Sequence, residues 1–346
     1  MTISRRGLLG LAAAGAGLAL AGCASGPGGS ASAAASAGAS GSAAKATIGL
    51  TYIPNVQFAP FYVAASQNLY RSAGVDVTLR HHGASEALFT ALVSGQEDFV
   101  VAGADEMIQA RSQGMDLVAI APYYRQYPVV LIVKEASPIK SAADLKGRSI
   151  GIPGRYGESW FGLKVLLASA GRTEADVKIA EIGYTQQAAL TTDKVDSIIG
   201  FSNNDVVTFV AGGVPVRTIA LTATGAPPLV SICLITTQAY LDAHGDLAKK
   251  VADASVAGQA AVVKDPAQAL TISTDYVTTL KTDDAARTAA GKTLEATVPL
   301  WAGTSGVVDA KLDAAQFATM ATFMKAQGLI TADVDPAKAM SNAYHS

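Results

Sequence analysis

Aromatic and hydrogen-bonding side chains gather in a few short segments of this sequence, and together they could hold a flat, polar ring. Phe, Trp and Tyr make up only 6% of the chain. Many of them nevertheless fall in or beside a few short segments that also supply Asn, Gln, Asp or Glu: Phe58, Tyr123, Tyr124, Tyr127, Tyr156, Trp160, Tyr184 and Phe201. Aromatic faces stack on a planar heterocycle, and amides and acids fix its ring nitrogens and exocyclic groups. The pattern therefore predicts a binding site for a small planar heterocycle.

The ligand-binding residues that we predict all come from these segments. They are Asn55, Phe58, Ser85, Asp105, Glu106, Tyr123, Tyr127, Tyr156, Glu158, Trp160, Tyr184, Asn203 and Asn204. The same segments carry the cations Arg125 and Arg155 against a larger number of acids: Glu86, Asp105, Glu106, Glu158 and Asp205. An acidic rim repels an anion. We therefore expect a heterocycle, with small anions as the alternative.

Motifs for catalysis or metal binding are incomplete. The run from Gly291 to Thr293 resembles the end of a phosphate-binding loop, but no strand precedes it and Ala286 stands where the first glycine belongs. Ser137 and Lys140 match S-x-x-K without its companion motifs. His81 and His82 are neighbours on a predicted strand, so their side chains point to opposite faces. We predict no catalytic residue, no metal and no cofactor, and hence no enzyme.

The elements that must position these residues alternate between strand and helix. Glycines and capping residues bound the predicted helices, at 58–73, 85–94, 105–112, 159–170, 186–192 and 205–211. Predicted strands lie between them, at 46–53, 75–79, 98–102, 117–121, 129–133, 149–152, 177–182, 197–200, 216–221 and 230–236. From residue 238 the chain is mainly helical. This alternation predicts an α/β fold with mostly parallel sheets covered by helices.

The strand–helix pattern starts twice, which predicts two lobes. Extended stretches without helix signals, near 121–133 and 221–235, would carry the chain across as hinge strands. Residues 45–125 and 233–346 would form lobe 1, with the helical tail packed on it, and residues 126–232 would form lobe 2. Ligands of open α/β sheets bind beyond the carboxyl ends of strands. The predicted binding residues follow such ends.

The N-terminal segment predicts export. Arg5 and Arg6 precede an apolar run at 8–20 and small residues, as in a secretory signal peptide over residues 1–22. Leu-Ala-Gly before Cys23 resembles a bacterial lipobox, which implies lipidation of Cys23. The run is too short to span a bilayer, and residues 23–44 read as a disordered tether. We expect an extracytoplasmic, lipid-anchored protein, with general and twin-arginine export both open.

The composition of the chain limits the kinds of molecule that we expect it to bind. The formal net charge is −2 and no basic patch stands out, so we expect no binding to nucleic acid. Cys233 is the only cysteine of the predicted body and lies in an apolar run, which indicates a buried, inert thiol. The expected partner is a small molecule, and we expect a monomer.

Four segments resemble the NMT1/THI5-like, SsuA-like group of solute-binding proteins: residues 52–62, 94–99, 144–147 and 150–154. The resemblance runs from about Thr47 to Thr236 and is weaker in the tail. It implies a type II periplasmic-binding-protein fold, closure of two lobes around a solute, and delivery to the membrane permease of an ABC importer. Members of the group bind thiamine pyrimidine precursors, riboflavin, alkanesulfonates, taurine or nitrate.

The resemblance leaves the ligand open. Pyrimidine-precursor binders often carry a histidine about where Phe58 stands, and the runs 153–157 and 202–205 look closer to members associated with riboflavin. The predicted ligand is therefore riboflavin-like or a thiamine pyrimidine precursor, and alkanesulfonate, taurine or nitrate is the alternative. A THI5-like pyrimidine synthase is the alternative from another class. It would need a histidine inside the cleft, where only His81 and His82 are candidates.

Overall fold

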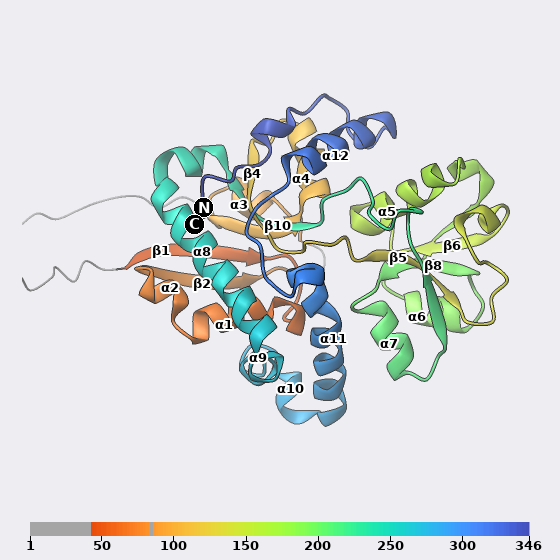
Figure 1. Cartoon of the computed structure of the whole chain (residues 1–346), viewed down its shortest axis with the longest axis horizontal. Helices are drawn as coiled ribbons and strands as arrows, with labels where there is room; N and C mark the ends of the chain where they lie inside the picture. Colours follow the sequence, from red (N-terminus) through yellow and green to blue (C-terminus); the bar gives the residue numbers. More distant parts are fainter. Residues whose placement is uncertain (1–42, 84–85, 346) are drawn as a thin grey trace, which may run out of the picture. The chain divides into compact units, whose positions relative to one another are not determined.

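The computed structural model describes residues 43–83 and 86–345. This part of the chain is built around two five-stranded sheets (Figure 1). The first sheet has the order β2 (Val75–His81), β1 (Ala44–Leu50), β3 (Phe99–Gly103), β10 (Ile232–Thr237), β4 (Leu117–Pro122). The second has the order β7 (Lys178–Glu181), β6 (Ser149–Ile152), β8 (Ser197–Phe201), β5 (Val129–Lys134), β9 (Val216–Ile219). We call each sheet with its helices a lobe.

One strand in each sheet runs against the others. β10 is antiparallel to β3 and β4, and β5 is antiparallel to β8 and β9, whereas the β1, β2 and β3 pairs and the β6, β7 and β8 pairs are parallel. The reversed strands are the ones that the chain enters after crossing, from β4 to β5 and from β9 to β10. The sheets are therefore mostly parallel, as predicted, with one reversed strand in each, since a crossing strand enters its new sheet from the opposite end.

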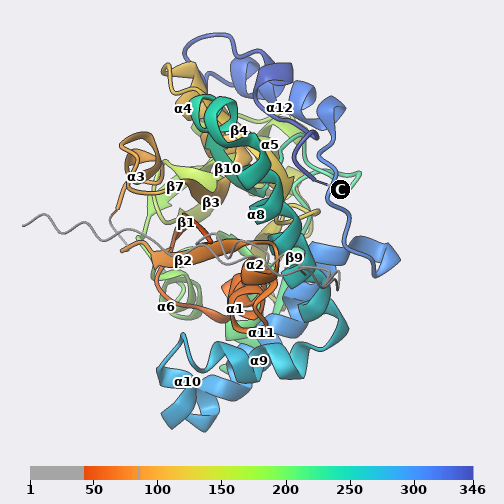
Figure 2. The same ribbon diagram turned by 90° about the vertical axis from the view of Figure 1, so that its left-hand side faces the viewer.

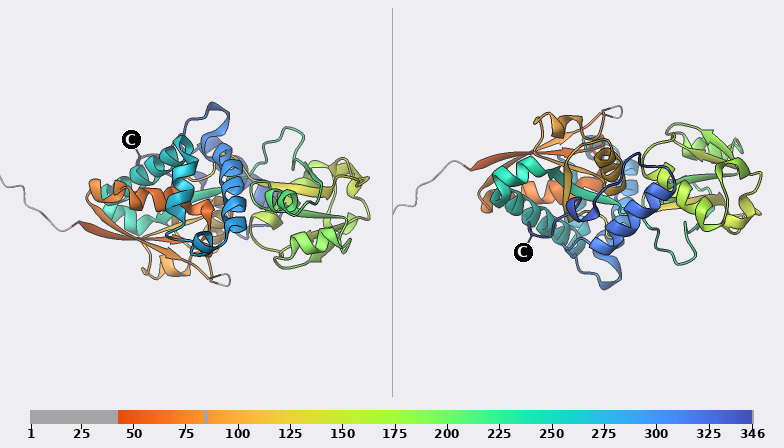
Figure 3. Two further views of the ribbon diagram at one scale, coloured as in Figure 1. Left: turned by 90° about the horizontal axis from the view of Figure 1, so that it is seen from below. Right: turned by 90° about the horizontal axis from the view of Figure 1, so that it is seen from above.

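The helices of the first lobe come from both ends of the chain. They are α1 (Ala59–Ser66), α2 (Leu69–Ser72), α3 (Thr90–Val93), α4 (Ala104–Ser112), α8 (Gln238–Lys264), α9 (Pro266–Ser273), α10 (Thr279–Thr282), α11 (Asp284–Ala302) and α12 (Ala314–Ala326). Helices α8 and α9 pack against α1 (Figure 2). The α1–α8 contact is close, because a Cβ on Gly258 would lie 2.3 Å from the Pro60 carbonyl oxygen. The helical tail thus covers the first sheet (Figure 3).

The second lobe is built from a continuous stretch of chain. Its helices are α5 (Gly157–Ser169), α6 (Gln186–Thr191) and α7 (Asp205–Ala211), and α7 also contacts α11 of the tail. Phe161 and Phe209 are fully buried here, as Phe61 and Phe99 are in the first lobe. Short 3₁₀ helices complete the described elements: η1 (Val56–Phe58), η2 (Ala142–Leu145), η3 (Glu174–Asp176), η4 (Gly303–Ser305) and η5 (Pro336–Lys338).

Two predicted helices are shorter than expected. The helix predicted at 58–73 is interrupted by Asn68, whose φ of 57° lies in the left-handed region and separates α1 from α2. The helix predicted at 85–94 is reduced to α3, and Glu86 instead pairs with Arg80 of β2 at 2.7 Å. Because that ion pair draws the segment toward the sheet edge, only its last turn is helical.

The N-terminal predictions concern residues that precede the described part of the chain. The predicted signal peptide, Cys23 and residues 24–42 of the tether lie outside the described residues. Within residues 43–83 and 86–345, no helix combines the length and the apolar character that crossing a membrane requires. Cys233 is a buried free thiol, and burial raises its pKa.

Candidate functional site

A cavity of about 480 Å³ lies where loops of the two lobes meet. Its lining comes from segments that follow β1, β3, β6, β7 and β8, represented by Tyr52, Glu106, Glu158, Tyr184 and Asn204. Each of these segments leaves the carboxyl end of a strand, which is where ligands of open α/β sheets bind. Both lobes therefore contribute to one candidate site.

Aromatic rings form much of the cavity wall. Tyr52, Tyr156 and Tyr184 are 40%, 55% and 62% exposed, so their faces are open to a solute. Tyr123 and Tyr124 also line the cavity but are almost buried, and their rings lie 5.9 and 6.3 Å from that of Trp301. The site thus combines a rigid aromatic base with exposed rings from both lobes.

Carboxyl groups from the two lobes meet at the cavity. Asp105 and Glu106 stand at the start of α4, and Glu158 stands at the start of α5. The Tyr127 hydroxyl donates to Asp105 Oδ2 at 2.7 Å, and the Ser231 hydroxyl donates to Glu158 Oε1 at 2.6 Å. Gly157 has a φ of +67°, and a Cβ there would lie 3.1 Å from Glu106 Oε1. A glycine at this turn lets Glu106 of one lobe approach the first turn of α5 in the other.

These carboxyl groups hold protons near neutral pH. Burial raises the pKa of Asp105 to about 7, although hydrogen bonds from the Tyr127 hydroxyl and the Glu106 N–H lower it. Burial, followed by the charge of Asp105, raises the pKa of Glu106 to about 8. The same two causes raise the pKa of Glu158 well above its usual range. A cluster in this state can both donate hydrogen bonds to a solute and accept them.

Basic side chains are missing from the part of the cavity wall that the structure describes. None of its 22 lining residues is Lys, Arg or His. Arg125 and Arg155, the two cations predicted beside the site, are engaged elsewhere. Arg125 pairs with Asp309, and Arg155 pairs with Glu174 and Glu181. The described wall therefore offers rings, amides and carboxyls but no positive side chain.

The predicted binding residues fall into three groups. The cavity is lined by Phe58, Glu106, Tyr123, Tyr156, Glu158, Tyr184 and Asn204. Ser85 lies outside the described residues. The remainder stand behind the lining rather than in it: Asn55, Asp105, Tyr127, Trp160 and Asn203.

Each residue behind the lining has a structural partner. Asn55 Oδ1 accepts the Gln57 N–H at 2.9 Å and caps η1. Tyr127 and Asp105 bond each other. The ring of Trp160 faces Arg155, whose guanidinium carbon lies 4.9 Å from its centroid. Asn203 lies across the lobes, and its Nδ2 donates to Thr297 Oγ1 of α11 at 3.0 Å.

Fifteen lining residues are not among the predicted binding residues, although the sequence already places Tyr124, Phe201 and Asp205 in the same segments. The fifteen are Thr51, Tyr52, Gln57, Leu88, Gly103, Tyr124, Pro153, Gly157, Ser159, Gln186, Gln187, Phe201, Asp205, Thr208 and Ile232. Gln186 and Gln187 open α6 just after β7, so the rule that placed Tyr184 at a strand end could have found them. Tyr52 follows β1 by two residues and carried the same signal. Ile232 has no such signal, because it begins β10, which runs against its neighbours, and so it does not follow the carboxyl end of a strand.

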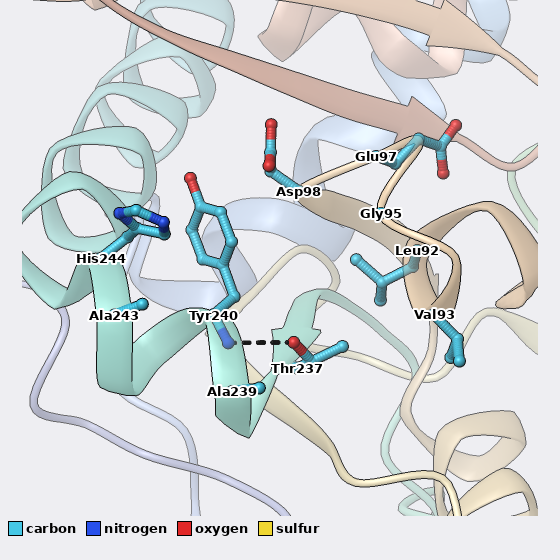
Figure 4. A pocket seen from close by; sticks show the side chains of 10 residues that line it. All are labelled: Leu92, Val93, Gly95, Glu97, Asp98, Thr237, Ala239, Tyr240, Ala243 and His244. Atoms are coloured by element: carbon cyan, nitrogen blue, oxygen red, sulfur yellow. Dashed lines mark hydrogen bonds between the residues drawn. The ribbon is translucent and has the colours of Figure 1, made fainter.

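A second cavity of about 260 Å³ lies beside the start of α8 (Figure 4). Tyr240 and His244 of α8 line it together with Glu97 and Asp98. The structure already uses both carboxylates, since Asp98 Oδ2 accepts the Thr47 N–H at 2.8 Å and Glu97 Oε1 accepts Arg80 Nη1 at 2.6 Å. The larger cavity is therefore the better candidate for a binding site.

Comparison with known proteins agrees with this fold. The model of the family described as NMT1/THI5 like matches residues 55–269. The chain is 30% identical over 308 residues to riboflavin-binding protein RibY of Chloroflexus aurantiacus, covering 87% of this chain and 86% of that protein. It is 22% identical over 224 residues to the formylaminopyrimidine-binding protein of Halalkalibacterium halodurans, covering 64% and 68%.

Among solved structures, the chain is similar to the alkanesulfonate-binding protein SsuA of Xanthomonas axonopodis pv. citri bound to MOPS. The TM-score is 0.65 with 20% identity, over 88% of this chain and 99% of that one. At this identity the likeness concerns the fold alone. The mixed sheets, the two crossings and the family match agree: the chain belongs to the NMT1/THI5-like family and has the two-lobed type II periplasmic-binding-protein fold.

Proposed function

We propose that this protein is the solute-binding component of an ABC importer and captures a small flat heterocycle of the riboflavin type. The observation that carries the proposal is the cavity wall: rings from both lobes surround carboxyl and amide groups, and its described residues include no basic side chain. A flat heterocycle stacks on such rings and pairs its nitrogens and carbonyls with such groups. The 30% identity to a riboflavin-binding protein supports the same ligand class.

Anionic solutes fit this wall less well. A sulfonate or nitrate is bound best by several N–H donors and positive charge, whereas Glu106, Glu158 and Asp205 line this cavity. A thiamine pyrimidine precursor is the second candidate, because it is also planar and rich in nitrogen, and a formylaminopyrimidine-binding protein is among the relatives. The binding role requires no chemistry on the solute.

Capture would proceed by movement of the lobes around the solute. Within the described residues only 123–128 and 220–231 connect the two sheets, so rotation about these two connections is the simplest closing motion. Under the boundaries proposed from the sequence, lobe 1 spans 45–125 and 233–346, and lobe 2 spans 126–232. The exposed rings of Tyr52 in lobe 1 and of Tyr156 and Tyr184 in lobe 2 would then cover the bound solute.

We further propose that the protein works outside the cytoplasmic membrane as a lipid-anchored monomer. The proposal rests on the paired arginines, the apolar run and Cys23 of the sequence. A Cys23→Ala variant should leave the membrane fraction and incorporate no labelled fatty acid. Wild-type protein that takes up no labelled lipid would exclude the anchor.

The ligand proposal is tested by titrating riboflavin and following its fluorescence, which stacking against tyrosine quenches. Riboflavin at a hundredfold its Kd should stabilise the protein by about 2.7 kcal/mol in thermal unfolding. A hydroxymethyl-pyrimidine, taurine and nitrate form the other arms. A thermal shift with taurine or nitrate and none with either heterocycle would overturn the proposal.

A variant pair places the ligand in the cavity. Tyr156→Ala removes an exposed stacking face, so it should weaken riboflavin binding by roughly 1–3 kcal/mol and leave the melting temperature of the free protein nearly unchanged. Val210→Ala is the control, because Val210 is 59% exposed in the same lobe and does not line the cavity. Equal affinities of the two variants for riboflavin would place the ligand elsewhere.

A further inference from the structure

The loop that carries Tyr52 into the cavity has little secondary structure of its own. It follows β1, and Tyr52, Ile53 and Pro54 are all exposed. Leu50, at the end of β1, stands in register with His81, at the end of β2. His81 does not line the cavity, but it contacts the loop at Tyr52 and the following η1 at Phe58.

The first contact determines the tautomer of His81. Its Nδ1 lies 3.0 Å from the Tyr52 carbonyl oxygen. A carbonyl oxygen can only accept, so Nδ1 carries the hydrogen. Burial lowers the pKa of His81, and the neighbouring His82 adds to this effect, while the bond to Tyr52 opposes it. The ring is therefore neutral at pH 7, with hydrogen on Nδ1 and a free lone pair on Nε2.

The lone pair on Nε2 has a donor in Tyr62. The Tyr62 hydroxyl lies 2.9 Å from Nε2 and must donate to it. Tyr62 is completely buried, and its ring stacks on Tyr276 with centroids 4.2 Å apart and planes 7° apart. Burial raises the pKa of Tyr62, and the nearby Asn55 backbone N–H opposes this rise. Tyr52 and Asn55, which bracket the loop, thus both lie against one pair of side chains.

The second contact reaches the cavity wall directly. The Phe58 ring meets the His81 ring edge to face, with centroids 5.4 Å apart and planes 68° apart. Phe58 lines the cavity, as Tyr52 does. One imidazole thus supports two aromatic residues of the wall from behind.

We propose that His81, as the neutral Nδ1–H tautomer held by Tyr62, is a positioning residue of the solute site, which fixes the Tyr52–Asn55 loop in its binding shape. The inference rests on the proposed solute-binding function. A loop held in its bound shape loses less entropy when the solute binds, so His81 raises affinity without touching the solute.

The experiment compares three substitutions at one position. His81→Ala should weaken riboflavin binding roughly tenfold, the effect of one lost hydrogen bond and the order it provides. His81→Asn should restore affinity to within about threefold of wild type, because an Asn amide places a donor near Nδ1. His81→Gln places its amide near Nε2 instead, so it should bind as weakly as His81→Ala. His345→Ala, near the end of the chain and away from the cavity lining, is the control.

Two measurements do not depend on the ligand, and the first of them needs no variant. Nitrogen-15 NMR of wild-type protein at pH 7 should show a neutral His81 with hydrogen on Nδ1. Hydrogen exchange should show a slow Asn55 amide that becomes at least tenfold faster in Tyr62→Phe. A charged or Nε2–H imidazole, or variants that all bind as wild type does, would overturn the inference. If wild type binds neither riboflavin nor the pyrimidine while His81 has the expected tautomer, the proposed function fails and the loop support stands.

Discussion

Glu97 and Glu106 are both acidic residues of the first lobe beside β3, yet their side chains have different partners. The Glu97 carboxylate is fully buried and accepts Arg80 Nη1 at 2.6 Å and His82 Nε2 at 2.9 Å. A Cβ on Gly49 would lie 2.2 Å from Glu97 Oε2, so the backbone itself leaves room for this carboxylate. Glu106 faces the large cavity, where no described lining residue is basic.

The difference separates a carboxylate that supports the fold from a carboxyl kept available for a partner. Glu97 has a partner for each of its oxygens inside the protein, so its loss should affect folding. Glu106 shares a buried cluster with Asp105 and Glu158, and burial and mutual repulsion keep protons on that cluster. Unpaired groups with shifted pKa values collect at functional sites, because a ligand can supply what the fold does not. The predictions below test this contrast.

The largest effect of a substitution should follow Glu97→Ala. It leaves His82 buried and removes the bond that holds Arg80, so we expect a loss of about 2–4 kcal/mol in the free energy of unfolding. Urea denaturation measures it. Riboflavin affinity of the folded protein should stay within about twofold. A stable Glu97→Ala protein that has lost its affinity would reverse the roles of the two regions.

The carboxyl cluster should make the free protein less stable as the pH rises. Asp105 and Glu106 have pKa values raised to about 7 and about 8, so between about pH 4 and pH 8 the native state binds protons that the unfolded chain has released. The free energy of unfolding should therefore fall, by about 4 kcal/mol from pH 6 to pH 9. Glu158→Gln should flatten this fall, because the amide cannot ionise. A stability that rises over this range would contradict the assignment.

A smaller effect should distinguish the roles of the neighbouring residues Asn203 and Asn204. Asn203 holds Thr297 across the lobes, so Asn203→Ala should cost about 1 kcal/mol in the unfolding of the free protein. Asn204 lines the cavity, so Asn204→Ala should leave that stability alone and weaken riboflavin binding by a similar amount. Calorimetric titration measures the affinity of both variants for riboflavin, and urea denaturation measures their free energy of unfolding. Weak binding by Asn203→Ala together with a destabilised Asn204→Ala would contradict these roles.

The smallest effect is expected at an exposed ion pair. Arg71 and Asp76 lie 3.0 Å apart with side chains 70% and 45% exposed. Asp76→Asn should change the free energy of unfolding by no more than about 0.3 kcal/mol, since solvent screens the pair. A loss comparable with that of Glu97→Ala would show that burial does not account for the contrast.

The sequence predicts the fold and the location of the site better than the direction of its side chains. Strand ends are marked by Gly, Pro and Asn, which is why the segments around Phe58, Glu106 and Tyr156 could be placed at one edge. Whether Asn203 or Asn204 faces the cavity depends on the backbone of the turn between β8 and α7, where Asn204 has φ −125° and ψ −65°. The ring of Trp160 faces Arg155 and does not line the cavity, and this direction depends on the folded backbone rather than on the local sequence. The sequence indicates His81 only as a metal or catalytic candidate. Its contacts with Tyr52 and Tyr62 cannot be predicted from the sequence, because they join segments distant along the chain.

The position of β10 has a consequence for the order in which the protein can assemble. In the first sheet β10 lies between β3 and β4, so a chain synthesised only as far as β4 has a gap in the middle of that sheet. The missing strand is Ile232–Thr237, which follows every strand of the second sheet. The second sheet uses only Val129–Ile219 and has no such dependence on later sequence. Contacts between distant segments form slowly, so the part of the protein that begins first along the chain should be the last to be completed.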